Sequence, residues 1–209
     1  EGACCKGSVG VLRRMYELGA RMMTLTWNHE NELASPQRNP GGVLVPQTEK
    51  GLTETGFAFL AEMERLHMIV DVSHLSDKGF WDIVEHGTRP FAASHSNCRA
   101  LAPHTRNLTD EMIRALAERG GIAGLNYYAP FLDADPTHPE RCRSTAALIA
   151  KHAAHYKQVG GAQMIALGSD FDGIDGPHQL ENAAFLPLLA DALRKEGFTE
   201  DEVEGVYFR

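Results

Sequence analysis

Short apolar runs alternate along this chain with longer stretches of helical periodicity, and this alternation limits the folds available to it. Five runs are predicted to be strands, at residues 21–26, 68–73, 90–94, 122–127 and 164–168. Helices are predicted at 9–18, 54–67, 76–86, 109–119, 145–158 and 182–196, with a last short one opened by the capping box Thr199-x-x-Glu202. Polar loops are predicted after the first strand, to about residue 52, and from 128 to 144. Strands that alternate with helices favour parallel βαβ units.

The parallel strands are predicted to form a barrel, because the glycine-rich G-x-G-x-x-G turn typical of a doubly wound sheet is absent. The fold class is therefore α/β, a (β/α)8 barrel of the TIM type. Such a barrel has about 250 residues. This chain has 209 and begins at Glu1 rather than at a methionine. We expect residues 1–209 to be one domain, an incomplete barrel that lacks its first strands.

Charge and cysteine content exclude several classes of protein. The formal net charge is −8, and an acidic chain without a basic run binds polyanions poorly, so nucleic acid is not an expected partner. No apolar stretch approaches the roughly 18 residues of a transmembrane helix. The four cysteines, at 4, 5, 98 and 142, contain no Cys-x-x-Cys pair. They are interpreted as reduced structural thiols.

Polar residues stand where three of the predicted strands end. The runs 69–72, 91–93 and 165–167 are followed by Ser73-His74, Ser94-His95 and Gly168-Ser169-Asp170. In a parallel barrel the carboxyl ends of the strands share one mouth, so these side chains are predicted to converge there. Alternation along the strand places Val70, Val72 and His74 on one face. Either histidine alone is equally well explained as a loop cap, but two imidazoles with a carboxylate favour a metal site.

At these residues the sequence resembles the membrane dipeptidase family, a branch of the metal-dependent amidohydrolase barrels. The resemblance runs over nearly the whole chain and rests on several short motifs in a fixed order. They are Glu1-Gly2, the segment 16–26, Gly51-Leu52-Thr53, the segment 71–76, Ser94-His95-Ser96, Arg106-Asn107 and the segment 168–173. Each motif alone is weak, and the order and spacing of the set make it specific.

The resemblance implies a role for each of five residues. Glu1 looks like a glutamate that bridges two zinc ions, and His74 and His95 look like the histidines that complete the second zinc site. Asp170 looks like the catalytic aspartate. Arg106 resembles the arginine that receives the carboxylate of the substrate, a role that suits the guanidinium fork.

The sequence departs from the family pattern in two places. The His-x-Asp pair that binds the first zinc in the family does not occur before Glu1. Many members also have a histidine after the Thr-Leu-Thr strand, where this chain has Trp27, followed by Asn28 and His29. We assign these three residues to substrate binding, with His29 or Asn28 as substitutes for the family histidine. Packing at the barrel mouth explains Trp27 equally well.

The predicted activity is that of a zinc-dependent dipeptidase. Two zinc ions would hold a bridging hydroxide that attacks the peptide carbonyl, with Asp170 transferring the proton to the leaving amine. The alternatives are another metal-dependent amidohydrolase acting on an amide, lactone or lactam, and a catalytically impaired fragment that only binds metal or peptide. The expected partner is a dipeptide, and the resemblance leaves open whether the chain forms a homodimer. The predicted location is the cytoplasm, as for the soluble bacterial forms.

Overall fold

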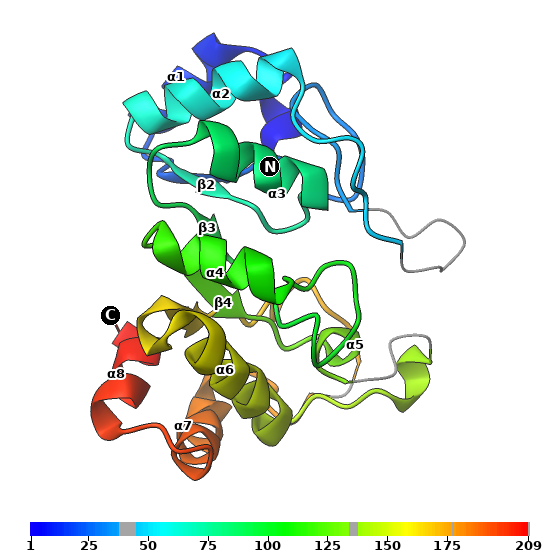
Figure 1. Ribbon diagram of the computed structural model, residues 1–209, viewed down its shortest axis with the longest axis vertical. Helices are drawn as coiled ribbons and strands as arrows, with labels where there is room; N and C mark the ends of the chain where they lie inside the picture. The colour runs from blue at the N-terminus through cyan, green and yellow to red at the C-terminus, as the bar shows by residue number, and fades with distance from the viewer. Residues whose placement is uncertain (38–44, 134–137, 177, 209) are drawn as a thin grey trace. The chain divides into compact units, whose positions relative to one another are not determined.

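A computed structural model describes residues 1–37, 45–133, 138–176 and 178–208. The chain forms two compact units, Glu1–Ala92 and Ala93–Arg209, coloured from blue to green and from green to red in Figure 1. Each unit combines parallel strands with helices. The chain is therefore an α/β protein with parallel strand pairing, as the alternation of strands and helices predicts.

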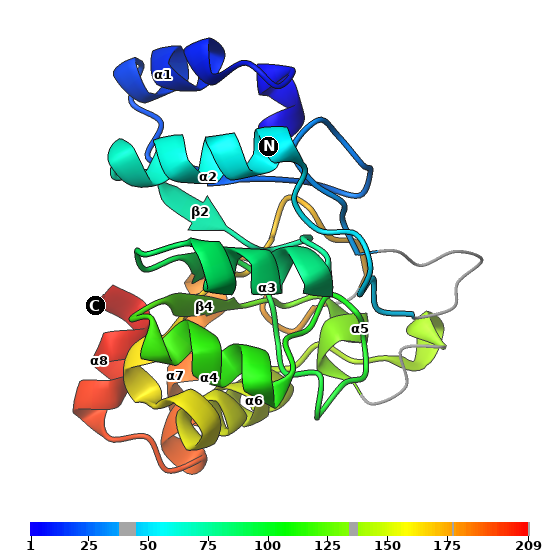
Figure 2. The same ribbon diagram turned by 45° about the horizontal axis from the view of Figure 1, so that its top comes forward.

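Unit 1 is built around two parallel strands. Its elements are η1 (Gly2–Cys5), α1 (Val9–Glu17), β1 (Met22–Thr24), α2 (Glu54–Arg65), β2 (Ile69–Asp71) and α3 (Asp77–His86), and β3 (Ala92–Ala93) begins at its last residue. β1 pairs with β2 in the register Met22 to Ile69, and Asp71 pairs with Ala92. Helices α2 and α3 lie beside β2 (Figure 2), so the apolar side chains of these three elements form the core of the unit.

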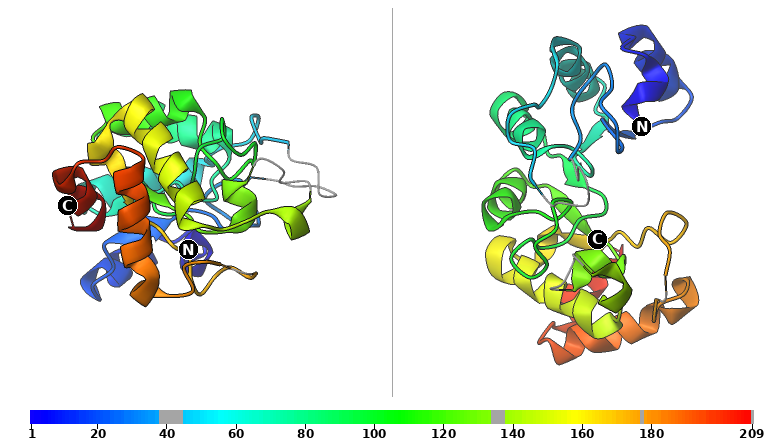
Figure 3. Two further views of the ribbon diagram at one scale, coloured as in Figure 1. Left: turned by 90° about the horizontal axis from the view of Figure 1, so that it is seen from below. Right: turned by 90° about the vertical axis from the view of Figure 1, so that its right-hand side faces the viewer.

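Unit 2 also pairs two of its strands in parallel and combines them with helices. Its elements are α4 (Asp110–Glu118), β4 (Ile122–Leu125), α5 (Ala129–Leu132), η3 (Pro139–Arg141), α6 (Ala146–Gly160), η4 (Ala162–Met164), β5 (Ile165–Leu167), η5 (Ala183–Phe185), α7 (Leu186–Lys195) and α8 (Glu200–Phe208). β4 pairs with β5 from Ala123 opposite Ile165 to Leu125 opposite Leu167. Helix α7 (orange) runs beside α6 (yellow), as Figure 3 shows. Tyr156 of α6 is fully buried.

Local sequence signals set the helix ends. The Ser76 side chain accepts a hydrogen bond from Gly79 N, and the Thr109 side chain accepts one from Met112 N, so both predicted N-caps are confirmed. The capping box is confirmed in both directions. Thr199 N donates to the Glu202 carboxylate at 2.8 Å, and Glu202 N donates to Thr199 Oγ1 at 3.2 Å.

The five predicted strands are all present, but they are shorter than expected. The strand predicted over 68–73 ends at Asp71, because Leu75 N turns back to Val72 O at 3.0 Å. Strand alternation therefore does not extend to His74, and the shared face of Val70, Val72 and His74 stays a prediction. Val70 lines a cavity with Leu60 of α2.

The predicted loop 128–144 contains two short helical segments in the structure, α5 and the 3-10 helix η3. Within 128–144, where only a loop is expected, the chain forms α5, a four-residue helix with a proline in its first turn and no capping side chain. So short a segment gives no helical periodicity in the sequence. Parts of both predicted loops, residues 38–44 and 134–137, lie outside the described residues. Among the helices that the structure describes, none is long and apolar enough to cross a membrane. The closed or incomplete state of the barrel, and its count as one domain, remain predictions.

Candidate active site

His74 lies three residues beyond the end of β2 and is held by the loop that follows β1. Its Nδ1 lies 2.9 Å from Asn28 Oδ1. Since an amide oxygen only accepts hydrogen bonds, Nδ1 carries the proton and the lone pair of the neutral ring is on Nε2. The residue has φ = 69°, a left-handed conformation that is uncommon for a non-glycine residue and is found often at functional sites.

The carboxylate of Asp71 shapes the turn that leads to His74. It accepts hydrogen bonds from Ser73 N at 3.0 Å and from Thr24 Oγ1 at 2.7 Å, and it is 1% exposed. These hydrogen bonds connect the turn to β1 and β2. A buried carboxylate with two donors is well satisfied, so Asp71 is a structural residue rather than a ligand.

The three residues predicted to bind substrate after β1 have different environments. Trp27 is 56% exposed, and its ring lies 6.4 Å from that of His74 and 6.3 Å from that of His29, measured between centroids. Asn28 orients His74, as described above. His29 is exposed. The structure therefore brings Trp27 and Asn28 close to His74, and substrate binding by the three residues remains a prediction.

Glu1 is placed at the N-terminus of η1. Its Oε1 accepts hydrogen bonds from Ala3 N at 3.1 Å and from Asn31 Nδ2 at 3.0 Å. Asn31 also donates to Leu25 O at 2.8 Å, so this amide connects the carboxylate to the end of β1. The next residue must be glycine, because a Cβ at Gly2 would lie 2.5 Å from Leu25 O. This close approach gives a physical reason for the Glu1-Gly2 pair.

In unit 2, the segment after β3 places His95. Its Nδ1 lies 2.7 Å from Ser94 Oγ, and its carbonyl oxygen accepts a hydrogen bond from Arg106 Nη2 at 3.4 Å. The adjacent Ser96 N donates to Gly124 O at 2.9 Å, which fixes this segment beside β4. The Arg106 guanidinium thus contacts the backbone of His95.

Arg106 is buried beside an aromatic ring and a neutral imidazole. It is 8% exposed, and its guanidinium lies 5.5 Å from the centroid of the Phe131 ring. His104 Nδ1 accepts a hydrogen bond from Arg106 N at 3.1 Å. Burial, with further contributions from Arg106 and Arg99, lowers the pKa of His104 to about 4, so this imidazole is neutral at neutral pH. A buried guanidinium in an otherwise acidic chain is suited to bind a carboxylate.

Asp170 follows β5 and is oriented by Asn126. Asn126 Nδ2 donates to Asp170 Oδ2 at 3.1 Å, and Asn126 Oδ1 accepts from Tyr128 N at 2.6 Å, so the orientation of this buried amide is fixed. Asp170 has φ = 62°, the same unusual backbone region as His74. A Cβ at Gly173 would lie 2.3 Å from Asp170 Oδ1, so a larger residue there would displace this carboxylate oxygen.

A network of three buried asparagines supports these two parts of unit 2. Asn97 N donates to Asn107 Oδ1 at 3.2 Å, next to Arg106 in the chain, and Asn97 Oδ1 accepts from Asn126 N at 3.0 Å. All three residues are fully buried. Asn97 therefore links the segment that carries Arg106 to the strand end that orients Asp170. Sequence reasoning missed Asn97 and Asn126, although Asn126 is a polar residue at a predicted strand end, as His74 is.

The donors predicted for a metal are one carboxylate and two imidazoles, from Glu1, His74 and His95. These are zinc ligands by chemical type. Fixing the proton on Nδ1 of a histidine through a hydrogen-bond acceptor, as Asn28 does for His74, is the arrangement typical of metal-binding imidazoles. Within the ranges that the structure describes, no three His, Cys, Asp or Glu side chains gather as a metal site. The predicted residues fit a metal by donor type and by the orientation of His74.

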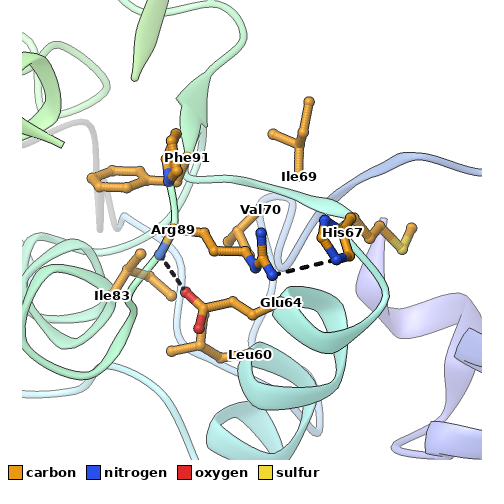
Figure 4. A pocket seen from close by; sticks show the side chains of 10 residues that line it. Leu60, Glu64, His67, Ile69, Val70, Ile83, Arg89 and Phe91 are labelled. Carbon is orange, nitrogen blue, oxygen red and sulfur yellow. Dashed lines mark hydrogen bonds between the residues drawn. The ribbon is translucent and has the colours of Figure 1, made fainter. Parts of the chain in front are cut away.

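A cavity at the other end of β2 is a poor candidate for the active site. It has a volume of about 240 Å³, and Glu64, His67 and Arg89 are the polar residues of its mostly apolar lining (Figure 4). The Glu64 carboxylate accepts hydrogen bonds from Thr88 N at 2.6 Å and Arg89 N at 2.9 Å, so it anchors the loop before β3. The cavity lies at the start of β2, whereas His74 follows its end.

Comparison with known proteins decides the family. The family model described as "Membrane dipeptidase (Peptidase family M19)" matches residues 1–209. This chain belongs to the membrane dipeptidase family. The predicted resemblance is therefore confirmed.

Three relatives show how much of a family member the chain represents. It is 37% identical over 200 residues to a protein encoded in the pqqA 5′ region of Klebsiella pneumoniae, covering 95% of this chain and 72% of that protein. It is 35% identical to the dipeptidase aclJ of Aspergillus oryzae, covering 96% of this chain and 46% of that one. A metallopeptidase of Rhodobacter sphaeroides, solved with a phosphinate mimic of the dipeptide L-Ala-D-Ala, superposes with a TM-score of 0.86 at 32% identity. That match covers 96% of this chain and 56% of the solved one, so the chain spans about half the length of two of these three relatives.

Proposed function

We propose that this chain supplies the dipeptide-binding and proton-transferring residues of a metal-dependent dipeptidase. The observation that carries the proposal is the asparagine network of unit 2. Asn97 connects the segment of Arg106 with Asn126, the partner of Asp170. A cation for the substrate and a carboxylate for proton transfer are thus held on one buried framework.

Arg106 is proposed to bind the free carboxylate of the dipeptide. Two parallel hydrogen bonds from a guanidinium match a carboxylate in geometry and charge. Burial strengthens such a pairing, because little water competes for it. Recognition of the terminal carboxylate would restrict the substrate to peptides with a single residue beyond the scissile bond. Trp27, Asn28 and His29 are proposed to contact the substrate from the loop after β1.

Asp170 is proposed to move the proton during hydrolysis. Its carboxylate would accept a proton from the attacking water and deliver it to the leaving amine. The Asn126 amide holds Oδ2 by donating a hydrogen bond. This contact orients the carboxylate, and orientation is what a group needs to accept and return a proton along one path.

Glu1, His74 and His95 are proposed to bind the metal, with zinc as the metal that suits these donors. When bound, the metal would polarise the scissile carbonyl and activate water. The proposal draws support from Asn28, which leaves the lone pair of His74 on Nε2. It also draws support from the solved metallopeptidase with 32% identity.

Hydrolysis of a dipeptide before and after removal of metal tests the proposal. We expect release of both amino acids, loss of activity after dialysis against a chelator, and recovery with zinc. Far-UV circular dichroism of the metal-free protein is the control for unfolding. Undiminished hydrolysis by fully chelated, folded protein would contradict the proposal.

A further inference from the structure

Three sulfur atoms meet where η1 packs against α1. Cys4 Sγ lies 4.0 Å from Cys5 Sγ, Cys4 Sγ lies 3.8 Å from Met15 Sδ, and Cys5 Sγ lies 3.7 Å from Met15 Sδ. The three contacts form a nearly equilateral triangle. None of the three residues has a part in the proposed hydrolysis.

The turn between the two helices creates this arrangement. Lys6 and Gly7 both have positive φ, at 46° and 68°, and Ser8 then caps α1. The chain therefore reverses within three residues and lays η1 against the helix that carries Met15. Cys5 is buried, Met15 is half-buried and Cys4 is exposed. The triangle is thus fixed on its inner side and reachable from solvent at Cys4.

The size of the triangle matches a single metal ion. A point equidistant from the three sulfurs lies about 2.2 Å from each, close to the roughly 2.3 Å of a zinc–thiolate bond. An ion at that point would have three sulfur ligands in one plane, without movement of any side chain.

The donor set selects the kind of ion. Two thiolates and a thioether are soft ligands, which favour copper(I). A thioether is not among the usual ligands of zinc, and zinc in structural sites takes four ligands. Hard cations prefer oxygen. We infer that Cys4, Cys5 and Met15 form a three-coordinate site for a soft monovalent cation of the copper(I) class.

Binding must displace two protons. Burial, and after it the neighbouring Cys4, raises the pKa of the Cys5 thiol to about 11, so Cys5 is protonated at neutral pH in the metal-free protein. Each thiol loses its proton to solvent as its sulfur binds the ion, while the thioether binds unchanged. The loaded site carries one net negative charge, from two thiolates and one monovalent cation, and no oxidant or reductant is consumed.

Anaerobic titration of the reduced, zinc-free chain with copper(I), in competition with the chelator bicinchoninate, tests the inference. A prior thiol count of four confirms that Cys4 and Cys5 are reduced. We expect one equivalent of copper(I) to bind. X-ray absorption should show three sulfur ligands at about 2.2–2.3 Å, the range of metal–thiolate bonds. Copper left entirely with the chelator, or bound to nitrogen and oxygen, would overturn the inference, as would displacement of copper by equimolar zinc.

Matched variants locate the site. Cys4→Ser, at an exposed position, should abolish tight binding. Met15→Leu keeps the apolar volume and should weaken binding by at least about tenfold, since even residues beyond the ligands contribute that much to metal affinity. Cys142→Ser is the control, because that thiol donates to His138 O at 3.5 Å and should leave copper binding unchanged. Equal affinity in wild type, Cys4→Ser and Met15→Leu would show that the ion binds elsewhere and refute the inference.

Discussion

The two units hold their candidate site residues in different ways. In unit 2, Arg106 is buried, and Asn126, which orients Asp170, belongs to a network of asparagines that are 0% exposed. In unit 1, Glu1 and Asn28 are exposed and His74 is half-buried. Buried, satisfied polar networks are rigid. The comparison suggests that unit 2 is organised for its substrate before binding, whereas the ligand residues of unit 1 depend more on the ion that they bind.

Acid should destabilise the two units in different pH windows, and this is the largest effect we expect. Burial is the main cause that lowers the pKa values of His104 and His152 to about 4 in unit 2. In the unfolded chain the pKa of each imidazole is about 6.5, so above pH 6.5 both states are neutral and neither histidine lowers the stability. As the pH falls toward 4, protonation of the unfolded chain lowers the free energy of unfolding by at most about 3 kcal/mol for each histidine.

In unit 1, hydrogen bonds from Arg65 and Arg13 lower the pKa of Glu62 to about 2. That contribution is present above about pH 4.5 and is lost only as the pH falls toward 2. Hydrogen exchange between pH 7 and pH 5, corrected for the intrinsic rate, should show loss of protection in unit 2 first. Equal loss of hydrogen-exchange protection in both units between pH 7 and pH 5 would contradict the two separate pH windows.

Asn126→Ala should impair turnover more than substrate binding. The variant removes the amide that orients Asp170 and leaves Tyr128 N without its acceptor. We expect kcat to fall by up to about 100-fold, as for other misplaced catalytic groups, with KM little changed. The free energy of unfolding should fall by about 1–3 kcal/mol. Steady-state kinetics and urea unfolding measure both, with the exposed Gln158→Ala in α6 as control. A higher KM at constant kcat would contradict a positioning role.

Asn28→Ala should have the smallest effect, confined to the metal. Loss of its contact with His74 Nδ1 should lower zinc affinity by about 10- to 100-fold, while thermal stability stays the same because the side chain is exposed. Chelator competition measures the affinity, with the exposed Thr48→Ala as control. Unchanged zinc affinity would separate His74 from the metal site.

Local signals in the sequence predicted the framework, and non-local contacts explain what was missed. Ser76, Thr109 and the Thr199–Glu202 box act within a few residues, so the sequence alone places those helix ends. The Asn126 contacts with Asn97 span 29 residues, and the contact with Asp170 spans 44. No periodicity reveals such pairs. The identity of His74, His95, Arg106 and Asp170 as candidates came from strand ends and the family resemblance, whereas their supporting amides required the structure.

The central proposal is that Arg106 binds the free carboxylate of a dipeptide. Its most direct test compares kcat/KM for a dipeptide and for the same dipeptide amidated at its C-terminus, in the wild type, Arg106→Ala and Arg106→Lys. We expect Arg106→Ala to lose about 10- to 100-fold with the dipeptide, the value of hydrogen bonds to a charged group, and little with the amide. Arg106→Lys should recover part of that loss. An equal loss with both substrates would contradict the claim.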